Sequence, residues 1–331
     1  MKIVHSFGRF KIRKNVKDEL SFILANKIGG YCCLASRPLS RYQGVFFNNN
    51  FKMYKVIENI KLADSDVKEL KNNFSNIERK KGNIVENFFM PHGFNSLAYE
   101  LNKSSEIELI LDIRESYFNP EFGRHYEIFE ENGKIIIKYR QENEFECYLA
   151  ISGFLKYEKI QRWVKQHYEL DEQRNSPPYE KYVFSALKIR LKQLIFSFSF
   201  DKQKAIEENN FISKNIGKLK NRQKTDIAGI INKNKHTLGR IKNKETKAAY
   251  ICALNSLNNL VVSVNGNSGI YAGLPWFFQF WARDEAIALS SLIYFEKKDI
   301  IKKILSRLID SIKEGKIINK YPDGNIYSID A

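Results

Sequence analysis

The sequence predicts an α+β protein with more than one domain, and three observations lead to this prediction. Up to about residue 200, apolar residues recur mostly at every second position, in runs rich in Ile, Tyr and Phe that clusters of Asn, Gly and Ser separate. Beyond residue 200 the spacing of apolar residues becomes that of helices. A chain of 331 residues with 43% hydrophobic content can also fill two cores, since single cores stop growing near about 250 residues.

Residues 1–200 are expected to form an antiparallel β-sandwich. Strands joined by short turns, with no helices alternating between them, are typical of such sandwiches and not of parallel βαβ sheets. The dipeptide Asn132-Gly133 predicts a hairpin, because both residue types tolerate the positive φ of a tight turn. The predicted strands cover residues 45–51, 54–60, 107–113, 125–129, 134–139, 144–151 and 194–200.

Residues 201–245 are expected to form a basic helical linker that begins with a helix at 201–210. Lys and Arg are densest between residues 214 and 247. A solvated helix explains this density, and we favour that interpretation over a binding patch. The basic stretch is expected to be interrupted at Gly217, Gly229 and Gly239.

Residues 246–331 are expected to continue as helices. The apolar stripe predicts a helix at 246–262, and residues 284–295 and 300–313 predict an antiparallel helical hairpin. In its second helix seven apolar side chains share one face: Ile300, Ile301, Ile304, Leu305, Leu308, Ile309 and Ile312.

The formal charge of +16 and the pI of about 9.4 raise nucleic acid or an anionic surface as a partner. The basic residues are, however, spread along the whole length, so we expect nucleic acid binding to be unlikely. The N-terminus has no apolar signal region, and no segment approaches the ~18 apolar residues of a membrane span. A cytoplasmic protein without a membrane partner is therefore expected.

Metal and disulfide sites are not expected. The four cysteines include the vicinal pair Cys32 and Cys33 but no Cys-x-x-Cys motif, which argues against zinc ligation and a disulfide framework. No two of the five histidines lie four residues apart, so no helical metal site is indicated.

The stretch Leu-Pro-Trp-Phe-Phe-Gln-Phe-Trp-Ala-Arg-Asp-Glu at residues 274–285 places five aromatic rings before an Arg-Asp pair. The C-H groups of a pyranose pack on an aromatic face. Arg can donate hydrogen bonds to the hydroxyl oxygens of the sugar, and Asp can accept hydrogen bonds from its hydroxyl groups. Sugar binding is one interpretation. The alternative is that the rings form a core and that Asp284 stabilises a helix N-terminus.

The order of residues in this stretch resembles a known family. Ile-Tyr-Ala-Gly-Leu-Pro-Trp-Phe at 270–277, followed by Trp-Ala-Arg-Asp, resembles the segment that opens the toroid of the amylo-alpha-1,6-glucosidase, or glycogen debranching enzyme, family. Related glucoamylase-like enzymes share the Trp-x-Arg-Asp element, in which Arg and Asp hold hydroxyls of the sugar in the cleavage subsite. The resemblance implies that residues 246–331 begin an (α/α)6 toroid.

Two further stretches resemble the same family. Residues 316–331 look like its Gly-Leu-Ile-Pro-Asn-x-x-Pro-Asp and Tyr-x-x-Val-Asp-Ala, although the Pro after the Ile pair is missing here. Residues 22–31 and 40–44 are similar to its N-terminal signature, with Gln43 where His is usual and Ser40 where Arg is usual. Gly29, Gly30 and Gly44 are expected in turns. Arg41 and Tyr42 could bind glucan, but packing between domains is favoured.

The resemblance implies the function and the site. The function is hydrolysis of α-1,6-linked glucose at branch points of glycogen or limit dextrin, without a cofactor. A non-catalytic module that binds glucan or nucleic acid is the alternative. The residues expected to bind substrate are Trp276, Phe277, Trp281, Arg283, Asp284 and Asp330.

The resemblance places the general acid and base beyond residue 331, so no catalytic residue is expected within this sequence. A toroid of twelve helices needs roughly 200 residues, whereas residues 246–331 provide 86. We therefore expect the N-terminal part of a debranching enzyme, as a split gene product or a fragment, that is inactive without further helices. A second polypeptide could complete the toroid. Glu285 is expected on the first turn of its helix without a catalytic part, and Asp323 in a turn.

Overall fold

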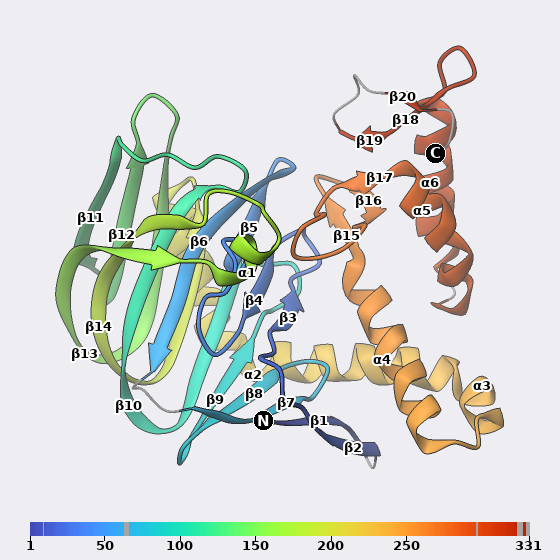
Figure 1. Cartoon of the computed structure of the whole chain (residues 1–331), viewed down its shortest axis with the longest axis horizontal. Coiled ribbons are helices and arrows are strands. Elements are labelled where there is room, and N and C mark those ends of the chain that lie inside the picture. Colours follow the sequence, from blue (N-terminus) through green and yellow to red (C-terminus); the bar gives the residue numbers. More distant parts are fainter. Residues whose placement is uncertain (9, 63–65, 296, 323–326, 329–331) are drawn as a thin grey trace.

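The computed structural model describes residues 1–331 except 9, 63–65, 296, 323–326 and 329–331. A β-rich part precedes a mainly helical part, and the long helix α2 connects them (Figure 1). The strands of the β-rich part are β1 (Lys2–Phe7), β2 (Phe10–Asn15), β3 (Phe22–Ala25), β4 (Tyr31–Leu34), β5 (Gly44–Asn49), β6 (Lys52–Leu62), β7 (Val67–Asn72), β8 (Ile77–Lys81), β9 (Ile84–Phe89), β10 (Ser96–Glu115), β11 (Arg124–Glu131), β12 (Lys134–Gln141), β13 (Phe145–His167) and β14 (Glu180–Ser199), with α1 (Glu169–Gln173) between the last two.

The strands form a two-layered sandwich, because the sheet branches at β10. The first part of β10 pairs with β9, whereas its second part pairs with β6 on the same side. β14 pairs with both parts, and the register of this ladder shifts between Glu100 and Ser105. Such irregularities let one strand pass from one layer of a sandwich into the other. One layer therefore continues through β9, β8, β7, β1 and β2, and the other through β6, β5, β4 and β3.

The two layers enclose one large apolar core. Phe22 of β3 lies 4.9 Å from Phe88 of β9, and Phe47 of β5 stacks on Phe198 of β14 at 5.6 Å between ring centroids. The expected sandwich is thus present, and each of the seven predicted strands overlaps an observed one. It is not purely antiparallel, since β1 and β7 pair in parallel.

A cluster of buried charges lies at the centre of the second layer. Asp112 of β10 accepts hydrogen bonds from Arg114 at 2.8 Å and from Arg124 at 2.9 Å. Lys181 and Lys55 lie 3.5 and 3.7 Å from the same carboxylate. Burial raises the pKa of Asp112, but the four cations outweigh this effect and hold the pKa well below its usual range. Asp112 therefore remains an anion that compensates several buried cations.

The expected linker is mostly one helix, and its first half packs on the sandwich. α2 (Lys202–Lys233) begins after Asp201, whose side chain caps it by accepting from the Lys204 amide. Asn209 is buried and donates to the carbonyl oxygens of Ala150 and Ile195. The helix continues through Gly217 and Gly229, so the interruptions expected there are wrong. It ends at Lys233 and is followed by α3 (Lys235–Arg240), which includes Gly239.

The remaining residues contain helices and short strands. The elements are α4 (Lys244–Leu260), β15 (Val261–Val264), β16 (Asn267–Ile270), β17 (Phe280–Trp281), α5 (Ala282–Leu289), the 3₁₀ helix η1 (Ser290–Phe295), α6 (Lys298–Asp310), β18 (Ile317–Ile318), β19 (Lys320–Tyr321) and β20 (Tyr327–Ser328). The predicted helix at 246–262 and the helical hairpin are confirmed within a few residues, except that residues 290–295 are 3₁₀. The (α/α)6 toroid stays a prediction, as the described residues supply only these helices of it.

The apolar stripe of α6 is only partly buried. Ile304 and Leu308 pack against η1 in one cluster, whereas Ile309 is 63% exposed and Ile312 is 52% exposed. Ile287 on α5 is 72% exposed, so apolar surface continues onto the neighbouring helix. None of the helices in the described part of the chain is both long and apolar enough to cross a bilayer.

Candidate functional site

The turn between β3 and β4 lies directly under the segment that carries Trp276 and Phe277. The Tyr31 hydroxyl donates to the carbonyl oxygen of Pro275, and the Tyr271 hydroxyl donates to that of Gly29, each at 3.3 Å. Two stretches that are more than 240 residues apart in sequence are thereby joined. Aromatic and aliphatic side chains fill the space between them: Tyr31, Cys33, Phe46, Met53, Val262, Val264, Tyr271, Phe278 and Phe280.

Gly29 allows this close approach. Its φ is +102°, and a Cβ at this position would lie 2.6 Å from the Tyr271 hydroxyl oxygen. Both the backbone conformation and the lack of space exclude a larger residue without rearrangement. The expectation of a turn glycine is confirmed here.

The third stretch singled out in the sequence joins the same place. β17 pairs antiparallel with β19, with Trp281 opposite Lys320 and Phe280 opposite Tyr321. The Ala282 amide then donates to the carbonyl oxygen of Asn319 at 3.0 Å, which fixes the start of α5. All three stretches therefore meet around residues 270–282, the segment that leads into α5.

Trp276 and Phe277 lie on a loop that the sandwich supports. The Tyr117 hydroxyl, from the loop after β10, donates to the Trp276 carbonyl oxygen at 3.1 Å. The Arg174 guanidinium covers the Trp276 ring at 4.3 Å from its centroid, so one face of this ring is occupied. Phe277 is 50% exposed and meets Trp281 edge to face at 6.3 Å. A ligand can therefore reach Phe277 more easily than the covered face of Trp276.

Trp281, Arg283 and Asp284 lie together where α5 begins. Trp281 is partly buried, while Arg283 and Asp284 are exposed on the first turn. The Trp281 Nε1 atom is buried and has no hydrogen-bond partner among the described residues. A buried N-H without a partner is costly, and a bound hydroxyl or water would satisfy it. Asp330, the sixth predicted site residue, lies outside the described residues, as does Asp323.

Glu285 is part of the framework under the site. Its carboxylate is fully buried and accepts from the Ile270 amide at 2.8 Å and from Arg307 at 2.9 Å. Burial raises the pKa of Glu285, although Arg307 and the Ile270 amide oppose this effect. The Arg307 guanidinium also lies 4.9 Å from the Phe280 ring centroid. Glu285 thus links α5 to β16 and α6, and its lack of a catalytic part stays a prediction.

Arg41 packs within the sandwich, whereas packing between domains was favoured from the sequence. Its side chain is 7% exposed and lies 3.5 Å from the buried carboxylate of Asp171. It also donates to the Ser176 carbonyl oxygen and lies over the Tyr42 ring at 4.8 Å. Gln43 accepts from the Leu39 amide, which fixes the same loop.

The site can bind a ligand with apolar faces and a polar rim. Phe277 and Trp281 offer ring surface, and the Arg283 and Asp284 side chains beside them offer donors and acceptors. Among the described residues of the site, Asp284 is an exposed carboxylate and Glu285 is engaged by Arg307. With Glu285 engaged by Arg307, the described residues of the site offer no pair of carboxyl groups for general acid and base catalysis. The described residues also hold no group of three or more His, Cys, Asp or Glu suited to a metal ion.

Sequence reasoning missed the residues that support the site. Tyr117 stacks on Phe278 at 5.0 Å and accepts a hydrogen bond from Gln279, and Arg174 covers Trp276. Both belong to loops of the sandwich, far from residue 276 in sequence. The sequence Ser-Tyr-Phe-Asn-Pro at 116–120 places aromatic residues in a polar loop, and this pattern could have indicated that Tyr117 contacts another part of the chain.

Among solved structures, the chain is similar to a crystal structure of bacterial glucoamylase complexed with acarbose, with a TM-score of 0.49 and 14% identity. The match covers 97% of this chain and 55% of that chain, so this chain spans about half the length of the glucoamylase. Comparison with curated proteins gives no match.

Residues 248–330 match the sequence model of the family described as amylo-alpha-1,6-glucosidase. The resemblance noted at 270–284 and 316–331 is thereby confirmed for this part of the chain. These residues, about a quarter of the whole, carry a segment of that family.

Proposed function

We propose that this chain is the substrate-binding part of a cytoplasmic glycoside hydrolase that removes α-1,6-linked glucose at branch points of glycogen or limit dextrin. The observation that carries the proposal is the meeting of three stretches around residues 270–282, where Trp281 pairs with Lys320 next to Phe277 and Arg283 and Asp284 follow on the first turn of α5. The family match over 248–330 supports it.

The chemistry of a terminal glucose suits these groups. The rings of Phe277 and Trp281 would pack against C-H groups of the sugar. Arg283 would donate to hydroxyls and Asp284 would accept from them. These interactions hold and orient the sugar and need no cofactor.

Cleavage requires two further groups. Inversion at the anomeric carbon needs a protonated carboxyl beside the leaving oxygen and an ionised one that activates water, about 6.5–9.5 Å apart. We propose that residues outside this sequence supply both, either in the same protein or in a second polypeptide that completes the helical toroid. The chain alone then binds glucan but does not hydrolyse it.

Binding is tested with a branched α-glucan oligosaccharide by calorimetry. Trp281→Ala and Asp284→Asn are each expected to weaken binding about tenfold or more, equivalent to about 1.4 kcal/mol. Trp163→Ala is the control, because Trp163 is 42% exposed but lies on β13 of the sandwich. Equal losses in all three variants, or no binding by the parent chain, would contradict the proposed site. Binding of nucleic acid that collapses as salt rises would favour phosphate recognition instead.

Catalysis is tested by glucose release from limit dextrin. The chain alone is expected to release none, whereas glucan binding persists. Glucose release by the purified chain, lost on Asp284→Asn, would place catalysis within these residues and overturn the second half of the proposal.

A further inference from the structure

A cation-rich pocket lies where the sandwich, α2 and the C-terminal helices meet. It measures about 490 Å³ and shares His92 and Asp226 with a neighbouring pocket of about 370 Å³. These sizes suit a small metabolite. The larger pocket is lined by Lys27, His92, Thr225, Asp226, Gly229, Ile230, Lys233, Asn258, Phe295 and Lys297.

The inner wall of this pocket carries two ammonium groups. Lys27 is partly buried in the turn between β3 and β4, and its Nζ donates to the Val261 carbonyl oxygen at 3.3 Å. Lys297 is partly buried before α6, and its Nζ donates to Asn258 at 3.2 Å. Each ammonium group has three N-H donors. The hydrogen bond given above for each lysine uses one of its three donors.

Among the described lining residues, one carboxylate is available to offset the two ammonium groups. Asp226 is the sole carboxylate among the described lining residues, and it is exposed at the rim. Val261 follows the end of α4, so the helix dipole favours the Lys27 ammonium there. Arg222 and Lys233 add positive charge at the rim.

The pKa values of Lys27, Lys297 and His92 are lowered in this pocket. Burial lowers the pKa of Lys27 well below its usual value, and the nearby Lys297 lowers it further. Burial and the nearby Lys233 lower the pKa of Lys297, against the opposing effect of Asp226. Burial, Lys27, Lys297 and Arg222 lower the pKa of His92 to about 3. Burial is the largest cause of each shift and neighbouring cations add to it, so the pocket disfavours protonation of these three groups.

The backbone holds Lys27 in an unusual conformation. Its φ is +70°, in the left-handed region that L-residues rarely adopt. The Ser263 amide donates to the Lys27 carbonyl oxygen at 2.9 Å, and the Gly93 amide donates to that of Asn26 at 2.7 Å. Strained residues that the surroundings hold in place are frequent at ligand sites. The turn is thus fixed by β15 on one side and by the His92 loop on the other.

We propose that this pocket binds a small phosphate monoester, with the phosphate between Lys27 and Lys297. A dianion matches two ammonium groups, and its oxygens can accept from both at once. The pocket volume leaves room for the esterified group beyond the phosphate. The site is separate from Phe277 and Trp281, so it does not depend on the proposed glucosidase function.

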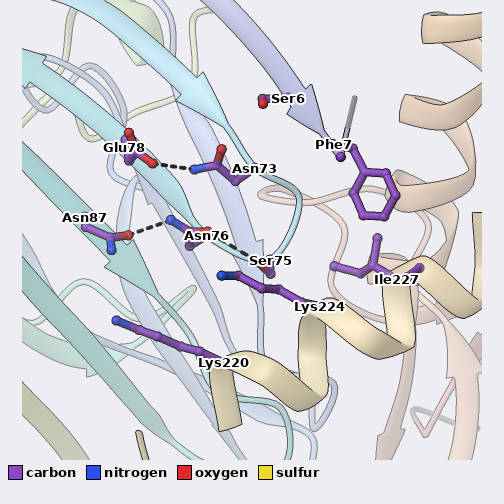
Figure 2. Close-up of a pocket in the computed structure, with 12 residues that line it drawn as sticks. Ser6, Phe7, Asn73, Ser75, Asn76, Glu78, Asn87, Lys220, Lys224 and Ile227 are labelled. Atoms are coloured by element: carbon purple, nitrogen blue, oxygen red, sulfur yellow. Dashed lines mark hydrogen bonds between the residues drawn. The ribbon is translucent and has the colours of Figure 1, made fainter. Parts of the chain in front are cut away.

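A second basic pocket of about 630 Å³ provides the contrast. Lys220 and Lys224 extend from α2 beside Asn76 and Asn87 (Figure 2). Here the Lys220 ammonium is already paired with Glu100, at 2.7 and 2.6 Å from its two oxygens. Lys224 is exposed, so its charge is hydrated. The partly buried ammonium group described in this pocket, that of Lys220, is therefore already engaged by a carboxylate.

The proposal is tested by calorimetry on the full chain with inorganic phosphate and a hexose monophosphate as probes. Lys297→Met is expected to weaken binding of the monoester at least tenfold, and Lys297→Arg to retain most of it. Asp226→Asn removes the competing carboxylate and is expected to tighten binding several-fold. Lys224→Met, in the second pocket, should leave the affinity unchanged. Tighter binding of the monoester than of inorganic phosphate supports a metabolite, and equal affinity supports a site for free phosphate.

Proton uptake gives an independent readout. Bound phosphate would raise the pKa of Lys27 and Lys297, so titrations in buffers of different ionisation enthalpy should show net proton uptake by the parent chain, and this uptake should grow as the pH rises toward the lowered pKa values. The uptake should shrink in Lys297→Met. Absence of binding at millimolar probe, equal losses in Lys224→Met and Lys297→Met, or weaker binding in Asp226→Asn would each overturn the proposal. Folding of each variant is checked by circular dichroism, and Asp226→Asn remains informative if Lys297→Met does not fold.

Discussion

The hydroxyl of Tyr31 donates a hydrogen bond to the carbonyl oxygen of Pro275 across 244 residues of sequence. Burial raises the pKa of Tyr31 well above its ordinary value, so the hydroxyl keeps its proton and remains a donor throughout the physiological range. This contact links the sandwich to the loop of Trp276 and Phe277. The position of the candidate site is therefore set by the β-rich part as much as by the helices around it.

Gly29→Ala is predicted to destabilise the protein by about 2 kcal/mol or more, because it adds a steric clash to the cost of a positive φ. The new Cβ would lie 2.6 Å from the Tyr271 hydroxyl and 2.9 Å from Asn48. Gly133→Ala is the matched control, since Gly133 has φ +69° but open space around its Cβ position. Urea unfolding measures both. Equal losses would show that backbone conformation alone matters at Gly29.

Glu285 and Arg307 are predicted to be energetically coupled. Glu285→Gln alone leaves the Arg307 guanidinium partly buried without its anion, which is expected to cost about 3 kcal/mol. Arg307→Met alone leaves the buried carboxylate without its cation, at a similar cost. The double variant should lose clearly less than the sum of the two, because neither unpaired charge remains. Additive losses in a double-mutant cycle of unfolding free energies would exclude the coupling.

Asp112→Asn is predicted to destabilise the sandwich by about 3–5 kcal/mol, since it leaves buried cations without their anion. Burial lowers the pKa of Lys181 to about 7 even with Asp112 nearby, so this lysine is expected to lose its proton first in the variant. Glu127→Gln, on the exposed side of β11, should change the unfolding free energy by less than about 0.5 kcal/mol. A loss no larger than that of the control would show that water reaches the cluster.

Glu208 is predicted to make stability fall as pH rises. Burial raises its pKa to about 7, against hydrogen bonds from Ser96 and the Asn95 backbone. The unfolded chain has the lower pKa, so its carboxyl ionises first. The contribution of Glu208 to the free energy of unfolding is fully present below about pH 4.5 and is lost as pH rises through 7. The unfolding free energy falls by up to about 3 kcal/mol over this range.

Glu208→Gln removes this dependence. The variant should match the parent near pH 4 and exceed it in unfolding free energy above pH 7. Glu207→Gln serves as the control, because Glu207 is the exposed neighbour on the same helix. Urea unfolding between pH 4 and 8 distinguishes them, and parallel pH profiles for the parent and Glu208→Gln would show that Glu208 ionises normally.

Strands with a run of Ile or Phe were predictable from the sequence, and strands with other patterns were not. β12 and the end of β14 carry the Ile and Phe runs that signal a strand. β4, Tyr-Cys-Cys-Leu, is buried at all four positions, so no alternation reveals it. β2 and β7 carry many charged residues and lie toward the edge of the sheet. The passage of β10 between two layers depends on which strands pair with it, which periodicity does not encode.

The continuity of α2 was missed because glycine was weighted as a helix breaker. A glycine inside a helix costs about 1 kcal/mol relative to alanine. The buried contacts of Ala205, Ile206, Ile212 and Ile227 can offset two such residues. Tertiary packing therefore overrides local propensity at Gly217 and Gly229.

The segments that form the candidate site could be predicted from the sequence, but the contacts between their side chains could not. Resemblance identified the stretch around Trp281 and Arg283, and the structure shows that β19 pairs with it. The cover of Trp276 by Arg174, and the ion pair of Glu285 with Arg307, join residues from different elements. Contacts of this kind depend on the whole fold, so local sequence patterns do not reveal them.

Helix α2 is a continuous helix that connects the two parts of the molecule (Figure 1). Its 32 residues span about 48 Å at 1.5 Å per residue. One end rests on β13 and β14, while the other contacts η1 and α4. A tilt of the helical part relative to the sandwich must therefore bend α2 or break its contacts with β13 and β14. A small rotation of the helix at one end displaces the other end by a larger distance.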